Sequence, residues 1–140
     1  MLSTKVYKSV YELAQKLMQA ASKEDSDTFH ARYAELKAIC VANEDTEKNH
    51  AVQWETLADF TEDADEALAL YTKALAIAVA DDAKDYMASI AFSMASLQVE
   101  LGQIGPAVQN LQDAKINACD TTDKQLEADI DGLLATLTKG

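Results

Sequence analysis

The chain has 140 residues, of which 49% are hydrophobic, and this is sufficient for one domain with a buried core. Four Gly, one Pro and 6% aromatic residues leave little turn chemistry for β-hairpins, so we expect an all-α fold without a sheet. The formal charge of −12 at pH 7 argues against nucleic-acid binding and against an anionic membrane surface, because both repel an acidic protein.

The acidic residues are concentrated in one stretch. Residues 44–66 carry a formal charge of −8, whereas residues 1–43 carry +1, residues 67–119 carry −2 and residues 120–140 carry −3. Such a field attracts basic protein partners, although acidity also keeps an Ala-rich helical protein in solution. We therefore expect another protein or peptide as the partner, basic or apolar in character, with no nucleic acid and no membrane.

Helical periodicity begins near residue 4. Apolar residues recur at intervals of three and four between residues 4 and 21, and the polar run SKEDSD then ends the first helix. A second apolar stripe extends from Phe29 to Cys40 and ends at the run NEDTE. These two segments predict a first antiparallel helix pair at about residues 4–42.

The third and fourth predicted helices are separated by the run TEDADE. An apolar stripe over residues 52–58 ends before this run, and Asp63 followed by Glu66 has the spacing of a capping box. A new helix therefore begins after Asp63 and continues to Asp81. Together the two helices predict a second pair at about residues 46–80.

The fifth and sixth predicted helices meet at the run GQIGP. Asp82 can cap the fifth helix, which extends to Gly102, where a glycine can end it. Pro106 suits the first turn of the sixth helix because its fixed φ is already helical. These helices predict a third pair at about residues 84–118.

The last predicted helix covers residues 122–138. Thr122 and Gln125 repeat the capping-box spacing, and the leucines that follow share one face of the helix. An amphipathic helix at this position can cover the exposed face of the last pair. We thus expect a single domain spanning residues 1–140, an α-α superhelix of three antiparallel pairs with a C-terminal capping helix, seven helices in total.

Small residues repeat at corresponding positions of the predicted pairs. A shift of 40 residues aligns Ala67 with Ala107, Tyr71 with Leu111, and Ala74 with Ala114. Small side chains let two helix backbones approach closely, while larger neighbours fill the gaps on either side. The repeat therefore predicts helix pairs that stack on one another.

These residues resemble the tetratricopeptide repeat. Trp54-x2-Leu57-Ala58, followed by Ala67-x3-Tyr71-x2-Ala74, is similar to one full unit. A second and weaker unit comprises Ala91, Met94, Ala95, Gly102, Ala107, Leu111 and Ala114. The usual glycine after the leucine is an alanine here, the terminal proline is absent, and the period of 40 exceeds the usual ~34 residues. Armadillo-like and HEAT-like solenoids and a generic helical bundle therefore remain alternatives.

The resemblance implies where a partner would bind. In that family the first helix of each pair lines a concave groove, and the matching positions here are Lys8, Tyr11, Gln15, Glu55, Asp59, Glu62, Ser89, Phe92 and Ser96, with Met18, Val52 and Val99 beside them. Some family members bind a terminal carboxylate with Lys, Arg and Asn. The groove positions here include one Lys and three acidic residues, which disfavour an acidic partner. Tyr11, Phe92 and Val99 could instead belong to the core.

Residues suited to catalysis or metal binding are scarce. His30 and His50 are the only histidines, they lack metal-ligand spacing, and both lie near helix starts, where a solvated role is ordinary. Cys40 and Cys119 lie in apolar runs typical of buried, unbridged thiols. A calcium-loop-like run that ends at Thr138 lacks the glutamate required at its twelfth position. We expect no enzyme activity, no cofactor and no metal.

The sequence thus predicts a protein-interaction function, an adaptor or scaffold that binds a partner polypeptide in a concave groove. A dedicated chaperone or immunity-type inhibitor of a basic client, such as a toxin or a secreted effector, is the alternative, motivated by the acidity of residues 44–66. The third hypothesis is an enzyme whose active site has no recognisable sequence motif. The N-terminus lacks a signal-peptide core, and no apolar run approaches the ~20 residues that cross a bilayer, so we expect a cytoplasmic protein. Exposed apolar groove residues could also pair with a second copy of the chain, so a homodimer is a further possibility.

Overall fold

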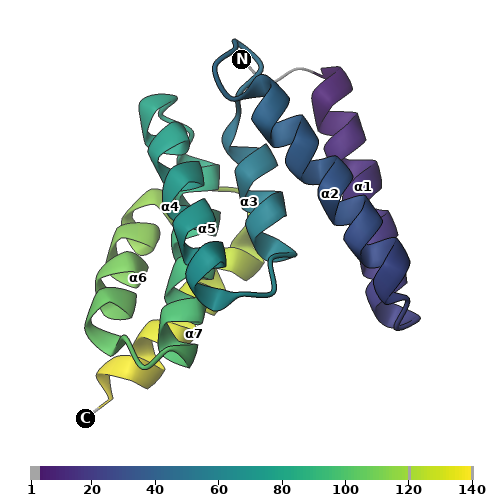
Figure 1. Ribbon diagram of the computed structural model, residues 1–140. Coiled ribbons are helices and arrows are strands. Elements are labelled where there is room, and N and C mark those ends of the chain that lie inside the picture. Colours follow the sequence, from purple (N-terminus) through teal and green to yellow (C-terminus); the bar gives the residue numbers. More distant parts are fainter. Residues whose placement is uncertain (1–3, 120, 140) are drawn as a thin grey trace. The chain divides into compact units, whose positions relative to one another are not determined.

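The computed structural model describes residues 4–119 and 121–139, and every regular element in this part of the chain is an α-helix (Figure 1). The helices are α1 (Thr4–Ser22), α2 (Ser26–Asn43), α3 (Ala51–Asp59), α4 (Ala64–Ala80), α5 (Lys84–Glu100), α6 (Ile104–Ala118) and α7 (Lys124–Thr138). The predicted all-α fold with seven helices is therefore confirmed for the described residues. None of these helices combines the length and the apolarity that crossing a bilayer requires.

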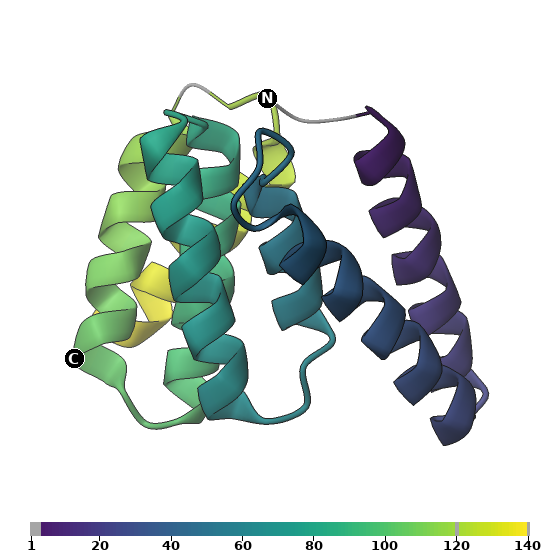
Figure 2. The same ribbon diagram turned by 45° about the horizontal axis from the view of Figure 1, so that its top comes forward.

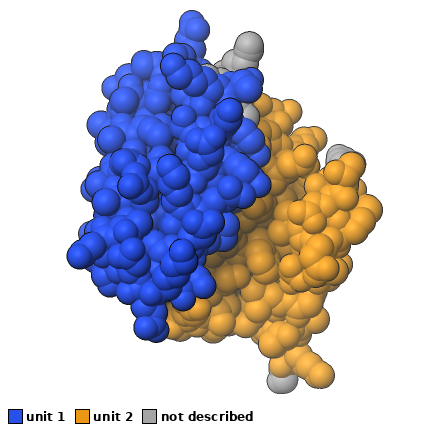
Figure 3. Space-filling view, turned by 90° about the vertical axis from the view of Figure 1, so that its right-hand side faces the viewer, with its two compact units in different colours: residues 1–70 blue, residues 71–140 orange. Residues whose placement is uncertain are grey.

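Two compact units divide the chain, residues 1–70 and residues 71–140, and the boundary lies inside α4. In the first unit α2 packs against both α1 and α3, and α1 also contacts α3. Figures 1 and 2 show α1 and α2 side by side, joined by a short turn. In the second unit α6 packs against both α5 and α7. Figure 3 colours the first unit blue and the second orange.

The first unit buries large aliphatic side chains on its helix faces. In α1 the buried residues are Val10, Leu13, Leu17 and Ala20, which recur at intervals of three and four as one helix face requires. Leu36 and Cys40 of α2 are fully buried, and so is Leu57 of α3, which is 1% exposed. The periodicity that predicted these helices therefore also marks their buried faces.

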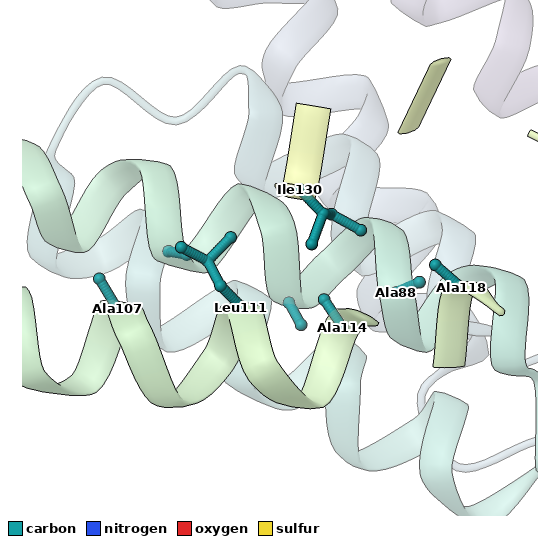
Figure 4. Close-up of a cluster of buried hydrophobic side chains, with 8 residues drawn as sticks. Ala88, Ala107, Leu111, Ala114, Ala118 and Ile130 are labelled. Atoms are coloured by element: carbon teal, nitrogen blue, oxygen red, sulfur yellow. The ribbon is translucent and has the colours of Figure 1, made fainter. Parts of the chain in front are cut away.

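Alanine dominates the buried cluster of the second unit. The members of this cluster are Ala88, Ala91, Ala95, Ala107, Leu111, Ala114, Ala118 and Ile130 (Figure 4). Small side chains on both α5 and α6 allow these two helices to approach closely, as the repeated alanines predicted. Helix α7 covers the cluster, because Ile130 is fully buried in it and four leucines of α7 pack against it.

Three turns between helices share one hydrogen-bonded geometry. The closing bonds run from Asp25 N–H to Ala20 C=O at 2.9 Å, from Ala83 N–H to Ala78 C=O at 2.9 Å, and from Gln103 N–H to Gln98 C=O at 2.8 Å. In each turn the residue before the donor adopts the left-handed conformation, with φ of 56° at Glu24, 51° at Asp82 and 76° at Gly102. Each turn is thus a Schellman-type helix end.

Asp82 therefore ends α4, and the expectation that it caps α5 is wrong. Ala83 occupies the position before α5 and makes no side-chain hydrogen bond there. The α4 carbonyl groups need a left-handed residue after the helix, and Asp tolerates this conformation better than most residues other than glycine.

The other predicted helix starts are mostly confirmed. Asp63 caps α4, because its Oδ1 accepts a hydrogen bond from the backbone N–H of Asp65 at 3.1 Å. Pro106 lies in the first turn of α6, as expected. Helix α7 is capped by Asp123 and not by Thr122, since the Asp123 carboxylate accepts from the N–H of Leu126 at 3.0 Å. An ionised acceptor is favoured at the positive end of a helix.

Candidate partner-binding site

Three of the predicted groove residues lie on the exposed side of α1. Lys8, Tyr11 and Gln15 are all exposed, and the Tyr11 hydroxyl accepts a hydrogen bond from Gln15 Nε2 at 3.0 Å. Tyr7 and Met18 extend this surface, so aromatic and apolar side chains follow one another along the helix, with Tyr11 54% exposed and Met18 55% exposed. Tyr11 is therefore a surface residue, and the alternative that it belongs to the core is wrong.

Three further groove residues lie at α3 and just beyond it. Glu55 is partly exposed and Asp59 is exposed, and they stand one helical turn apart on α3. Glu62 lies after the end of α3, in the turn that leads to α4. Their carboxylates, with that of Asp63, give this part of the first unit an acidic surface.

Ser89, Phe92 and Ser96 belong to α5 and hence to the second unit. Phe92 and Val99 are partly buried and pack against the alanine-rich cluster, as the core alternative predicted for both. Ser96 donates its hydroxyl to the carbonyl of Phe92 at 3.0 Å, which satisfies it within its own helix. That these residues share one groove with those of α1 and α3 stays a prediction.

A cleft opens in the first unit where the start of α2 meets the turn between α3 and α4. We call it the acid-aromatic cleft, and its lining residues are Phe29, His30, Tyr33, Phe60, Thr61, Glu62, Asp63 and Glu66. Its volume is about 280 Å³. Four rings and three carboxylates line it, and the described lining residues include neither Lys nor Arg.

A chain of hydrogen bonds fixes one wall of the cleft. Thr61 donates its hydroxyl proton to the carbonyl of Leu57 at 2.7 Å, so its oxygen is left as an acceptor. The Tyr33 hydroxyl, 2.7 Å from the Thr61 oxygen, must therefore be the donor of that bond. This chain ties the first turns of α2 to the end of α3 and holds the Tyr33 ring in place.

Aromatic packing forms a second wall. The rings of Phe29 and Phe60 meet edge to face, with centroids 6.3 Å apart and planes at 64°, in the geometry that the ring quadrupoles favour. His30 also meets Phe29 edge to face at 6.0 Å. The His30 side chain is 67% exposed, as the sequence predicted, and its Nε2 lies 4.0 Å from Glu62 Oε1, beyond hydrogen-bond range.

A second hollow adjoins the cleft and shares three of its residues. The α1–α2 hollow, with a volume of about 370 Å³, is lined by Ala20, Ala21, Glu24, Asp25, Ser26, Phe29, His30 and Glu62. Hydrogen bonds from Thr28, through its hydroxyl and its backbone N–H, hold the pKa of Asp25 below its ordinary value, and nearby Lys23 acts in the same direction. Asp25 therefore remains ionised at neutral pH, and the lining of the two hollows together includes Phe29 and the carboxylates of Glu24, Asp25, Glu62, Asp63 and Glu66.

The sequence identified only part of this cleft. Glu62 was predicted as a binding residue, and Asp63 and Glu66 were predicted to open a helix. Phe29 and Tyr33 were assigned to the apolar stripe of the second helix, and periodicity cannot show that both are only partly buried and line a cleft at the end of α3. The acidic turn after an aromatic residue, Phe60, was the one available signal.

The histidine, the cysteines and the calcium-loop-like run that could suggest catalysis or metal binding do not form such a site among the described residues. His50 is 9% exposed and its Nδ1 accepts a hydrogen bond from Val52 N–H at 3.1 Å, so it caps α3 and the expected solvated role is wrong. Neither Cys40 nor Cys119 forms a disulfide; Cys40 is buried as expected, whereas Cys119 is exposed, so its expected burial is wrong. The calcium-loop-like run lies within the continuous helix α7. Among the described residues, no three His, Cys, Asp or Glu side chains are grouped to hold a metal ion.

Two solved structures resemble this chain over nearly its whole length. PcrH in complex with the chaperone-binding region of PopD matches with a TM-score of 0.64 and 20% sequence identity, covering 99% of this chain and 95% of PcrH. PcrH from Pseudomonas aeruginosa matches with a TM-score of 0.63 and 20% identity, covering 99% and 96%. No protein-family model matches the sequence, and no curated protein matches it. The chain therefore has a tetratricopeptide-like helical fold.

Proposed function

We propose that the chain is an adaptor or scaffold that binds a segment of another polypeptide. The observation that carries the proposal is the likeness to PcrH over 99% of the chain, because one of the matching structures holds the chaperone-binding region of PopD. The exposed apolar side chains of α1 and the acidic surface of the first unit supply the two kinds of contact that peptide recognition uses.

The dedicated chaperone or inhibitor of a basic client is the second candidate. The charge of −8 over residues 44–66 favours it, because such a field accelerates the approach of a basic partner and rejects an acidic one. Binding without catalysis, a cytoplasmic location and the absence of a cofactor belong to both candidates. A second copy of the chain remains a further candidate partner, through the exposed apolar side chains of α1.

Affinity capture with a matched pair of variants tests the function. The double variant Glu55→Lys, Asp59→Lys reverses the charge of α3, and Glu100→Lys, Asp129→Lys makes the same charge change in the second unit. We expect at least one protein of the native host to be retained by the wild type and by the control, and to be lost with the α3 variant. Retention of every captured protein by the α3 variant would show that the binding surface lies elsewhere.

The salt dependence of the captured complex separates the two candidates. Charge-led binding of a basic client weakens steeply as ionic strength rises, because exposed charges more than ~10 Å apart are screened at 0.1 M salt. Capture of an apolar segment changes little over the same range. A steep decline in affinity therefore supports the chaperone or inhibitor, and a nearly constant affinity supports the adaptor.

A further inference from the structure

We propose that the acid-aromatic cleft binds the guanidinium group of an arginine carried by the partner polypeptide. The inference rests on the proposed function, since it names the chemistry of one contact with that partner. The cleft lies at the start of α2 and at the turn before α4. Of the groove residues predicted from the sequence, it includes only Glu62, so it is a separate site.

The rings supply the first half of this recognition. Phe29, Tyr33 and Phe60 line the cleft, and the Tyr33 to Thr61 hydrogen bond keeps one ring from turning away. The face of an aromatic ring is negative, so it attracts a cation, and a flat guanidinium can also stack on it. Arginine is favoured over lysine here because its charge is planar and more weakly hydrated than an ammonium group.

The carboxylates supply the second half. Glu62 and Glu66 line the cleft, and His30 approaches Glu62 to 4.0 Å without a hydrogen bond. Asp63 uses Oδ1 to cap α4. A guanidinium group has five N–H donors and binds carboxylates in pairs of parallel hydrogen bonds, so a carboxylate beside a ring matches both of its properties.

The adjoining α1–α2 hollow gives the rest of a peptide room to continue. It shares Phe29, His30 and Glu62 with the cleft and adds the carboxylates of Glu24 and Asp25. A partner segment can therefore place its arginine against the rings of the cleft while its next residues follow an acidic surface. Acidic side chains are repelled by these carboxylates, and neutral side chains lack the charge that the carboxylates attract, so the cleft favours basic segments.

Short peptides test the cleft without any knowledge of the natural partner. The probes are acetyl-Gly-Arg-Gly-amide, the same peptide with Lys, and the same peptide with citrulline, which has the shape of arginine without its charge. We expect the arginine peptide to shift the NMR signals of Phe29, Phe60 and Glu62 in a saturable manner. The lysine peptide should bind more weakly than the arginine peptide. The citrulline peptide should bind about tenfold more weakly than the arginine peptide.

Three variants assign the effect to the cleft. Glu62→Gln and Glu66→Gln remove charge with little change in shape, and Phe60→Leu removes a ring, whereas Glu100→Gln removes a carboxylate from the second unit as the control. Each cleft variant should weaken arginine binding severalfold, while the control should leave it unchanged. Well-dispersed NMR spectra identify the variants that fold, and the three peptides on the wild type remain decisive if any does not.

Two results would overturn the proposal. One is equal binding of the arginine and citrulline peptides, and the other is a set of shifts spread over acidic residues of both units with no saturation. If affinity capture finds a partner and the arginine peptide does not bind the cleft, this inference fails while the proposed function stands. If the arginine peptide binds the cleft and the wild type captures no host protein, the proposed function fails while the chemistry assigned to the cleft stands.

Discussion

The two units bury their interiors with different kinds of side chain. In the second unit six of the eight cluster residues are alanines, so α5 and α6 approach closely at the cluster. A hollow of about 220 Å³ lies beside it, where Met87 and Ala91 of α5 meet Asn110 of α6. In the first unit the end of α3 is held against α2 by large rings and by hydrogen bonds, and a cleft remains beside them. The two units therefore differ in the chemistry of their packing: small apolar side chains dominate the cluster of the second unit, whereas rings and carboxylates surround the cleft of the first.

Buried polar contacts strengthen this contrast. Gln53 of α3 is fully buried and donates from Nε2 to the carbonyl of Lys48 at 2.6 Å, while Cys40 of α2 donates to the carbonyl of Gln53 at 3.3 Å. Trp54 donates from its indole N–H to Asn49 Oδ1 at 2.8 Å. These bonds anchor the irregular segment before α3 to the helices of the first unit, so its structure depends on direction-specific contacts.

The largest effect is expected from the alanine-rich cluster. Leu111→Ala removes a fully buried side chain, and its alanine neighbours have no flexible atoms that could fill the cavity. The free energy of unfolding should fall toward the upper part of the usual range of about 2–5 kcal/mol. Urea unfolding followed by circular dichroism measures it, with the exposed Leu101→Ala as the control.

A loss below about 1 kcal/mol would mean that the cluster relaxes around the cavity. The close approach of α5 and α6 would then not depend on dense packing, and the contrast between the units would be weaker than their composition indicates.

Substitution of one buried glutamine in each unit compares how strongly the two units depend on buried hydrogen bonds. Gln53→Ala leaves the Lys48 carbonyl without its donor and opens a cavity, so unfolding should become easier by about 2–3 kcal/mol. Gln98 accepts from Asn110 Nδ2 at 2.8 Å, and Asn110 is partly exposed and can turn to water, so Gln98→Ala should cost about 1 kcal/mol. Equal losses in the same urea experiment would contradict the special dependence of the first unit on polar contacts.

Much of the fold was predictable because it depends on local periodicity. Intervals of three and four mark the buried faces of the helices, and the repeated alanines mark the contact of α5 with α6. The capping role of Asp63 followed from its spacing to Glu66, which is also a local property.

The cleft and the turns depend on contacts that periodicity does not contain. Phe29 looks like one more core residue of an amphipathic helix, and only the position of Phe60 across from it leaves a cleft. Similarly, Glu24 and Asp82 carry no preference for positive φ comparable to that of glycine. Closure of the hydrogen bonds at the preceding helix end imposes that conformation on them.

The smallest effects are expected at these turns, which occur in both units with the same geometry. Glu24→Gly in the first unit and Asp82→Gly in the second should each raise the free energy of unfolding by about 0.5–1 kcal/mol, because glycine adopts positive φ without steric cost. The gain should be larger for Glu24, since Asp tolerates the left-handed conformation better than Glu.

Two alanine substitutions provide the matched control, because the same change should have opposite signs at two glycines. A Cβ would meet nothing within 4 Å at either Gly102 or Gly132, so only the backbone decides. Gly102 has a φ of 76°, and Gly102→Ala should lower the free energy of unfolding by about 1 kcal/mol. Gly132 lies inside α7, where Gly132→Ala should raise it by up to about 1 kcal/mol. Effects of the same sign at both glycines would show that packing, and not backbone conformation, controls these positions.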